Sequence, residues 1–241
     1  MFSIERHEQI IEILRKRTSA SVHFLAKQLH VSEPTVRRDL ITLSNQKKIK
    51  RTFGGAVINT DFNAEVPLSL RESENRKAKE YVATEAVKYI KDDYVIFLDA
   101  SSTVSNVIKY LPEFKNLTVI TNSPKNSIKL AELKIKSFST GGEMLENSVA
   151  YVGTSAQNFI KKFNADLFLF SCRGISNDGM LNDSSIEETE IRKIMMKHSK
   201  KNIFLCSSDK IGKKYMYNLC YFKDIDEIIS DTEIQLDKNT F

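Results

Sequence analysis

The sequence predicts an α/β protein in two parts, an N-terminal winged helix-turn-helix and a larger C-terminal domain built on a mainly parallel sheet. Three observations lead to this prediction. The chain has 241 residues, more than most single domains. Its excess positive charge is confined to the N-terminal quarter, and strand-like runs alternate with helix-length segments from residue 94 onward. We expect the winged helix-turn-helix over residues 1–57, a linker over 58–75 and the larger domain over 76–241.

Composition excludes several classes of protein. Hydrophobic residues make up 41% of the chain and charged residues 28%, with 8 Gly and 4 Pro, which is typical of a soluble globular protein. No apolar run approaches the roughly 18 residues that a membrane span needs, and the charged N-terminus lacks the apolar stretch of a signal peptide. We therefore expect a cytoplasmic protein with no membrane partner.

The cysteines predict neither a disulfide nor a metal site. Cys172, Cys206 and Cys220 are odd in number and lack the spacing of metal ligands. They are expected to act as small buried hydrophobes. No metal and no cofactor is predicted.

The charge distribution indicates that only the first part of the chain meets a polyanion. Residues 1–60 hold 11 Lys and Arg against 5 Asp and Glu, whereas residues 61–241 hold 25 against 26. Attraction to phosphates depends on such a local excess rather than on the net charge of the whole chain. A basic but merely solvated surface is the alternative.

Three short helices are predicted in the first domain. Apolar residues at helical spacing mark the first two, Ile10, Ile13 and Leu14, then Val22, Leu25, Ala26 and Leu29. Ser32 can cap a third helix that carries Pro34 in its first turn. The inward face of that helix is expected to hold Val36, Leu40 and Leu43. Its outer face then carries Thr35, Arg38 and Thr42, with Arg37 beside them.

A groove-reading surface follows from this arrangement. About four residues separate the second and third helices, which is the turn length of a helix-turn-helix. Arginine can bond guanine or a phosphate with two parallel hydrogen bonds, and threonine offers a hydroxyl and a methyl group to base edges. A basic β-wing is expected next, Lys47–Arg51 followed by Thr52–Val57, with Gly54-Gly55 allowing a positive-φ turn or close packing. The candidate contacts to double-stranded DNA are Ser32, Thr35, Arg37, Arg38, Thr42, Lys50 and Arg51.

The larger domain is predicted to begin with a helix over residues 76–91. The strand-like runs that follow cover residues 94–98, 117–121, 135–139, 165–171 and 202–207, with short strands near 219–222 and 227–230. The helix-length segments between them cover residues 103–111, 124–132, about 153–162 and 186–199. Such alternation is typical of a mainly parallel sheet covered by helices.

Polar loops follow the predicted strands, at the sheet edge where ligands of such folds bind. Hydroxyls and free backbone N–H groups there can hold a phosphate, and Asp99 can accept hydrogen bonds from sugar hydroxyls. A phosphorylated polyol fits this mixture, although each loop alone can equally be an ordinary helix cap. The candidate effector-binding residues are Asp99, Ser101, Ser102, Thr103, Thr121, Asn122, Gly141, Gly142, Arg173, Gly174 and Lys210.

These residues carry a family resemblance. The segment Ser21–Leu40, with Val31-Ser32 and Thr35-Val-Arg-Arg-Asp-Leu40, followed by Phe53-Gly-Gly-Ala56, resembles the DeoR family of bacterial transcription regulators. The resemblance implies that Thr35, Arg37 and Arg38 contact DNA. The alternative is a winged module that mediates protein contacts.

The larger domain resembles the DeoR sensor domain, so the similarity spans nearly the whole chain. That domain is similar in fold to ribose-5-phosphate isomerase, and in the family it senses phosphorylated sugars or related metabolites. This chain departs from the family pattern at three places. Ser101 replaces a usual glycine, Ser207-Ser-Asp-Lys210 stands where Asp-Ser-Ser-Lys is common, and Arg173 replaces a small residue.

We expect a sequence-specific DNA-binding transcription regulator, and we favour a repressor of sugar-metabolism genes. Its affinity for the operator is expected to change when a phosphorylated sugar or related metabolite binds. A homodimer or homotetramer is expected, because paired reading heads strengthen a weak contact. One alternative is a sugar-phosphate isomerase or deaminase with an accessory domain. Such an enzyme needs an acid-base pair at the sheet edge. Carboxylates for it are available at Asp99, Asp178, Asp183, Glu187 and Glu188. Catalysis is disfavoured because the larger domain has only one histidine, His198. The other alternative is a sensor domain that has lost its ligand and serves only assembly.

Overall fold

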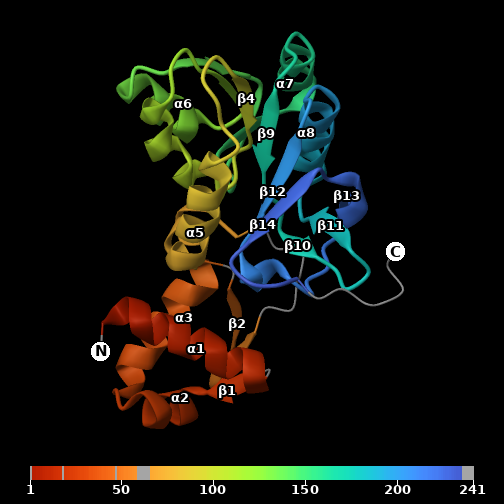
Figure 1. Ribbon diagram of the computed structural model, residues 1–241. Helices are drawn as coiled ribbons and strands as arrows, with labels where there is room; N and C mark the ends of the chain where they lie inside the picture. Colours follow the sequence, from red (N-terminus) through yellow and green to blue (C-terminus); the bar gives the residue numbers. More distant parts are fainter. Residues whose placement is uncertain (1, 18, 47, 59–65, 235–241) are drawn as a thin grey trace. The chain divides into compact units, whose positions relative to one another are not determined.

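The computed structural model describes residues 2–17, 19–46, 48–58 and 66–234. The chain divides into two compact units, Met1–Val66 and Pro67–Phe241 (Figure 1). Each unit has its own buried apolar core, as separate domains do. Within the described part of the chain, no helix is long and apolar enough to cross a membrane.

The smaller unit has three helices and a small antiparallel sheet of strand order β1-β3-β2. Its elements are α1 (Ser3–Arg17), β1 (Ser19–Ser21), α2 (Val22–Leu29), α3 (Glu33–Asn45), β2 (Ile49–Thr52) and β3 (Gly55–Ile58). The three predicted helices and the wing are therefore present. The three-residue strand β1 is too short for an alternating pattern to reveal it, and it adds the third strand beside β3.

The helix boundaries have identifiable causes. The Ser21 hydroxyl accepts a hydrogen bond from the Phe24 N–H at 3.1 Å, and the Ser32 hydroxyl accepts one from the Thr35 N–H at 3.4 Å, so each serine caps the helix that follows it. Between the two helices His30 adopts φ 52°, in the left-handed region that commonly ends a helix. The predicted apolar stripes meet in one core, which holds Ile10, Leu14, Val22, Leu25, Ala26, Leu29, Val36, Leu40 and Leu43.

Close packing explains the second glycine of the wing. Neither Gly54 nor Gly55 has a positive φ, so the positive-φ turn offered by the sequence is not formed. A Cβ on Gly55 would lie 2.1 Å from the carbonyl oxygen of Ala20. Strands β1 and β3 can therefore pair only because this position has no side chain. Lys47, included in the predicted wing, lies outside the described residues.

The predicted linker over residues 58–75 is corrected at its C-terminal end. Residues 59–65 lie outside the described part of the chain, but Leu68–Ser73 form a short helix, α4. Leu68 is buried, and its N–H donates to the Asn147 carbonyl at 2.7 Å. Residues 68–73 are therefore a packed part of the larger unit.

The larger unit is an α/β fold (Figure 1). Its first half contains α5 (Arg76–Val87), β4 (Val95–Leu98), the 3-10 helices η1 (Val104–Asn106) and η2 (Ile108–Glu113), β5 (Thr118–Thr121), α6 (Pro124–Glu132), β6 (Lys136–Ser139), β7 (Glu143–Leu145) and β8 (Ala150–Val152). Its second half contains α7 (Gly153–Ile160), β9 (Leu167–Phe170), β10 (Gly174–Ile175), β11 (Met180–Asp183), α8 (Ile186–Lys197), β12 (Asn202–Cys206), η3 (Ser208–Lys210), β13 (Tyr217–Tyr221), η4 (Phe222–Asp224) and β14 (Glu227–Ser230).

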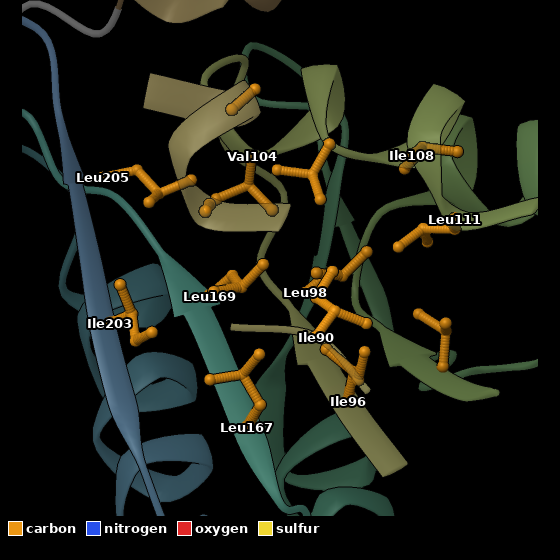
Figure 2. Packing of buried hydrophobic residues seen from close by; sticks show 14 of the residues in the cluster. Ile90, Ile96, Leu98, Val104, Ile108, Leu111, Leu167, Leu169, Ile203 and Leu205 are labelled. Atoms are coloured by element: carbon orange, nitrogen blue, oxygen red, sulfur yellow. The ribbon is translucent and has the colours of Figure 1, made fainter. Parts of the chain in front are cut away.

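Six parallel strands form the central sheet, in the order β14-β12-β9-β4-β5-β6, as the alternating pattern predicts. Alternate residues of each strand enter different cores. On one face Leu98, Leu169 and Leu205 pack with α5, η1 and η2, and Figure 2 shows these leucines pointing towards Val104. On the other face Phe97, Phe168, Phe170 and Phe204 pack with α7 and α8.

Three local features differ from the sequence-based prediction. The segment expected to be a helix over residues 103–111 forms two 3-10 turns, with Pro112 interrupting the α-helical hydrogen-bond pattern. The strand expected near residues 219–222 is β13, which belongs to a separate antiparallel sheet of order β10-β11-β13. The hairpin β7-β8 was not predicted, because its strands have only three residues each.

Candidate functional site

The outer face of α3 carries the side chains that the sequence predicts there. Arg37, Arg38 and Thr42 are exposed and Thr35 is half-buried, while the opposite stripe of the helix is buried in the core. These four side chains therefore project from one helix, whose width allows it to enter the major groove of DNA.

Local hydrogen bonds orient the side chains on this face of α3, and its positive charge is only partly paired among the described residues. The hydroxyls of Ser32 and Thr35 are hydrogen-bonded at 2.9 Å, and the Thr42 hydroxyl donates to the Arg38 carbonyl at 3.2 Å. One Arg37 nitrogen lies 3.5 Å from a Glu33 oxygen, an exposed i,i+4 pair of small energy. Arg38 makes no ion pair with any described residue. Its guanidinium is free to bind a base edge or a phosphate.

The wing adds two cations and an aromatic ring. Lys50 and Arg51 on β2 are exposed and make no ion pair within the described ranges. Phe53, in the turn between β2 and β3, is fully exposed. Because Phe53 is exposed in the same turn as these basic residues, it is a contact candidate that the sequence analysis did not include.

A buried carboxylate fixes α3 against α1. Asp39, 5% exposed, accepts hydrogen bonds from the Arg6 guanidinium at 2.6 and 3.0 Å, and lies 2.9 Å from His7 Nε2. Burial would raise the pKa of Asp39, but the bonds from Arg6 and His7 outweigh it and hold that pKa below its ordinary value. Sequence reasoning missed this contact, since Asp39 stands among the exposed polar residues of the Arg-Arg-Asp segment.

Asp39→Asn is expected to destabilise the smaller unit by about 1–2 kcal/mol, because the neutral amide offers one acceptor oxygen where the carboxylate offers two to Arg6 and His7. The folded-state pKa of Asp39 is lowered, so its contribution is present above the unfolded value of about 3.8 and is lost as the pH falls through the folded value. Hydrogen exchange of α1 and α3 near pH 7 measures the loss. Equal protection in the parent and the variant at neutral pH would contradict this role.

In the larger unit, the predicted effector-binding loops meet at one edge of the sheet, because the carboxyl ends of parallel strands face the same way. Direct bonds join them. The Ser171 N–H donates to the Asp99 carboxylate at 3.1 Å, and the Asn126 amide donates to the Asp99 carbonyl at 3.2 Å. The Thr140 N–H donates to the Thr121 carbonyl at 3.1 Å.

Asp99, expected to accept hydrogen bonds from a sugar, is buried and its carboxylate is bonded within the protein. Its carboxylate, 1% exposed, receives the Ser101 and Ser171 N–H groups and the Arg192 Nε at 2.8 Å. Arg192 also contacts Asp183 at 2.9 Å and Glu188 at 3.4 Å. Asp99 therefore anchors its loop to α8 rather than facing a ligand.

The hydroxyls of the first loop have different partners. Ser101 Oγ accepts the Val104 N–H at 3.2 Å, so the serine in place of the family's glycine acts as a cap. Ser102 Oγ lies 3.0 Å from the Lys79 ammonium, and Thr103 Oγ1 lies 3.1 Å from that of Lys210. The structure thus brings Lys210 to the loop, as predicted, together with a lysine that the sequence analysis did not identify.

The other predicted residues fall into two groups. Asn122, Gly141 and Gly142 lie in the loops at the carboxyl edge, with Gly142 at φ 117°, and Thr121 is the last residue of β5. The Thr121 hydroxyl is used internally, since it accepts the Ser123 N–H at 3.1 Å. Gly174 is buried in β10, where it pairs with Asn182, and Arg173 is half-buried beside it. Gly174 is therefore a strand residue, in contrast to its predicted role in a ligand loop.

Three buried polar atoms at this edge have no hydrogen-bond partner among the described residues. They are Asn122 Oδ1, Thr140 Oγ1 and Ser207 Oγ, in the segments after β5, β6 and β12. Buried polar atoms are normally hydrogen-bonded, so unpartnered ones gathered at one sheet edge indicate a site that a polar ligand or water completes. Catalysis has less support, because the carboxylates nearest the loop are bound to Arg192.

The chain matches two family descriptions. Residues 6–62 match the DeoR-like helix-turn-helix domain, and residues 74–232 match the DeoR C terminal sensor domain. Together they span both structural units.

Curated relatives match nearly the whole chain. An uncharacterized HTH-type transcriptional regulator, YulB of Bacillus subtilis, is 34% identical and covers 96% of this chain and 90% of its own. The L-fucose operon activator of Escherichia coli is 31% identical, with 94% of each chain covered. The lactose phosphotransferase system repressor of Staphylococcus epidermidis is 30% identical, with 96% of this chain and 93% of the relative covered. Among solved structures, a ribose-5-phosphate isomerase in complex with phospho-erythronic acid has a TM-score of 0.44 at 20% identity, over 56% of this chain and 54% of its own.

Proposed function

The chain belongs to the DeoR family of DNA-binding transcription regulators, and we propose that it controls sugar-metabolism genes in response to a phosphorylated sugar. Family membership confirms the predicted regulator over the alternative of an isomerase or deaminase. Two relatives are named for sugars, one as the L-fucose operon activator and one as the lactose phosphotransferase system repressor. We favour repression for this chain.

The observation that carries the DNA-binding part is the outer face of α3. Arg37 and Arg38 are exposed on one face of α3, and the opposite face buries Val36, Leu40 and Leu43 in the core. We assign base and phosphate contacts to Thr35, Arg37, Arg38 and Thr42, and assign phosphate contacts to Lys50 and Arg51 on the wing. Ser32 supports the surface by capping the helix.

The effector is assigned to the carboxyl edge of the parallel sheet. Support comes from the buried Lys210 on the hydroxyl of Thr103 and from two buried oxygens without a partner among the described residues, Asn122 Oδ1 after β5 and Ser207 Oγ after β12, at the same edge of the sheet. Gly141 and Gly142 supply backbone N–H groups in the same region. A phosphate group with an attached polyol suits these donors and acceptors.

We further propose a homodimer or homotetramer that acts in the cytoplasm. Two copies of α3 on DNA half-sites about one helical turn apart would multiply the affinity of a single unit.

The melting temperature of the larger unit tests the effector assignment. A phosphorylated sugar at 100 times its dissociation constant should stabilise the native state by about 2.7 kcal/mol, which is about 5–10 °C for a unit of this size. The experiment screens phosphorylated pentoses and hexoses against the same sugars without phosphate, which should give no shift. If no phosphorylated sugar shifts the parent, the larger unit serves assembly and the proposed effector class is wrong.

A further inference from the structure

Two buried lysines converge on adjacent residues of the loop after β4. Lys79, on α5, is 5% exposed and donates to Ser102 Oγ at 3.0 Å. Lys210, in η3, is 9% exposed and donates to Thr103 Oγ1 at 3.1 Å and to Ser171 Oγ. Lysines are almost never this buried without a negatively charged partner.

No carboxylate compensates either ammonium at close range. Within the part of the chain that the structure describes, neither lysine forms an ion pair. The charged groups that act on Lys79 are Lys210 and Arg71, both positive, and Asp209 and Glu74, both negative, and Lys210 has the largest effect of the four. Burial and the charge of Lys210 lower the pKa of Lys79 to about 8.

The remaining carboxylates of this region are already bound. Asp99 and Asp183 both contact Arg192, which leaves the loop after β4 to offer hydroxyls and ammonium groups. Nearby, Ser207 Oγ is buried without a partner among the described residues, and the Lys210 N–H donates to the Ser207 carbonyl at 3.0 Å. The site therefore has an excess of donors, which suits a dianionic group.

Lys79 also contacts the start of the larger unit. Its ammonium donates to the main-chain carbonyl of Arg71, in α4, in addition to Ser102 Oγ. This helix begins at Leu68, two residues after the boundary between the two units. One side chain thus bridges the loop after β4 and the first helix that follows the smaller unit.

We propose that Lys79 is a second phosphate-binding residue beside Lys210, and that its bond to the Arg71 carbonyl couples α4 to the occupied site. The proposal rests on the proposed function, since it names a residue through which the phosphorylated sugar is held. An anion bound to the Lys79 ammonium competes with the hydrogen bonds that this ammonium donates to the Arg71 carbonyl and to Ser102 Oγ. Occupancy therefore favours one position of α4 over others, which is the differential interaction that a regulated equilibrium requires.

Melting shifts with inorganic phosphate test the proposal on the full chain. We expect phosphate to stabilise the parent at pH 7.5 and much less at pH 9, because Lys79 loses its proton between these values. Lys79→Met should weaken phosphate binding about 10- to 100-fold at pH 7.5, the loss expected for one hydrogen bond to a charged group. Lys79→Arg keeps its charge and should retain the shift at both pH values. Circular dichroism of each variant without phosphate verifies the fold.

Hydrogen exchange over residues 68–73 tests the coupling. Phosphate should slow exchange of α4 in the parent and leave it unchanged in Lys79→Met. The same slowing in that variant would overturn the coupling. If phosphate stabilises parent and Lys79→Met equally at pH 7.5, or if sugar phosphates stabilise the parent and inorganic phosphate does not, the assignment of Lys79 is wrong while the proposed function stands. If neither stabilises the parent, both are overturned.

Discussion

Arg192→Met is expected to destabilise the larger unit by about 3–5 kcal/mol, the cost of removing one partner from a buried ion cluster. Arg192 is 3% exposed and is bonded to Asp99, Asp183 and Glu188. Methionine fills a similar volume, but it removes the buried cation to which Asp99, Asp183 and Glu188 are bonded. They must then take up protons or draw in water, and the loop after β4 loses its anchor on α8.

Lys193→Met is the matched control for this prediction. Lys193 is the next residue on α8, and its exposed ammonium pairs with Glu190 at 3.0 Å. Surface changes of this kind usually alter stability by less than about 0.5 kcal/mol. Urea titration with hydrogen exchange of β4, β9 and β12 compares the two variants. If Arg192→Met is as stable as Lys193→Met, the buried cluster does not hold this edge of the sheet.

Arg38→Ala is expected to weaken specific DNA binding by about 1–3 kcal/mol and to relax the preference at one base position. Its guanidinium is exposed on α3 and makes no ion pair among the described residues. The loss of binding free energy in the variant therefore measures the contact of Arg38 with DNA. Lys50→Ala should instead weaken all sequences alike and reduce the slope of affinity against salt. Duplexes that the parent enriches from a random library serve as the specific DNA.

Lys129→Ala removes an equal charge from an exposed position on α6 in the larger unit, and its DNA affinity should match that of the parent. Fluorescence anisotropy at several salt concentrations separates the three variants. Parent-like binding by both Arg38→Ala and Lys50→Ala would place the reading surface elsewhere.

The fold was predictable because local signals agreed with it. Ser32 marks a helix start, and the runs around Leu98, Phe168 and Phe204 have the length and composition of buried strands. The strand order was not predictable, since it depends on which strands pair across the chain. Short elements such as β1 and β7 carry too few residues for a periodic signal.

The sequence predicted where the candidate effector site lies, but it predicted the roles of only some of the site's residues. Polar residues after each strand identify the sheet edge, whereas their partners come from distant helices. Lys79 stands at helical spacing from Val82, Ala83 and Ala86, so its position on a buried helix face can be read from the sequence. Arg192 stands four residues after Glu188, a spacing that is equally common on exposed helix faces. Spacing cannot give the choice of partner, so the bonds of the Asp99 carboxylate to Arg192 and to two backbone N–H groups could not be read from the sequence.

The affinity of the full chain for its enriched DNA, measured with and without a phosphorylated sugar that stabilises the larger unit, tests the central claim most directly. We predict that saturating sugar phosphate changes this affinity about 5- to 150-fold, the range of typical coupling between two sites, and that the same sugar without phosphate leaves it unchanged. An affinity that stays the same when the larger unit is saturated would contradict the claim that this chain is a sugar-phosphate-controlled regulator.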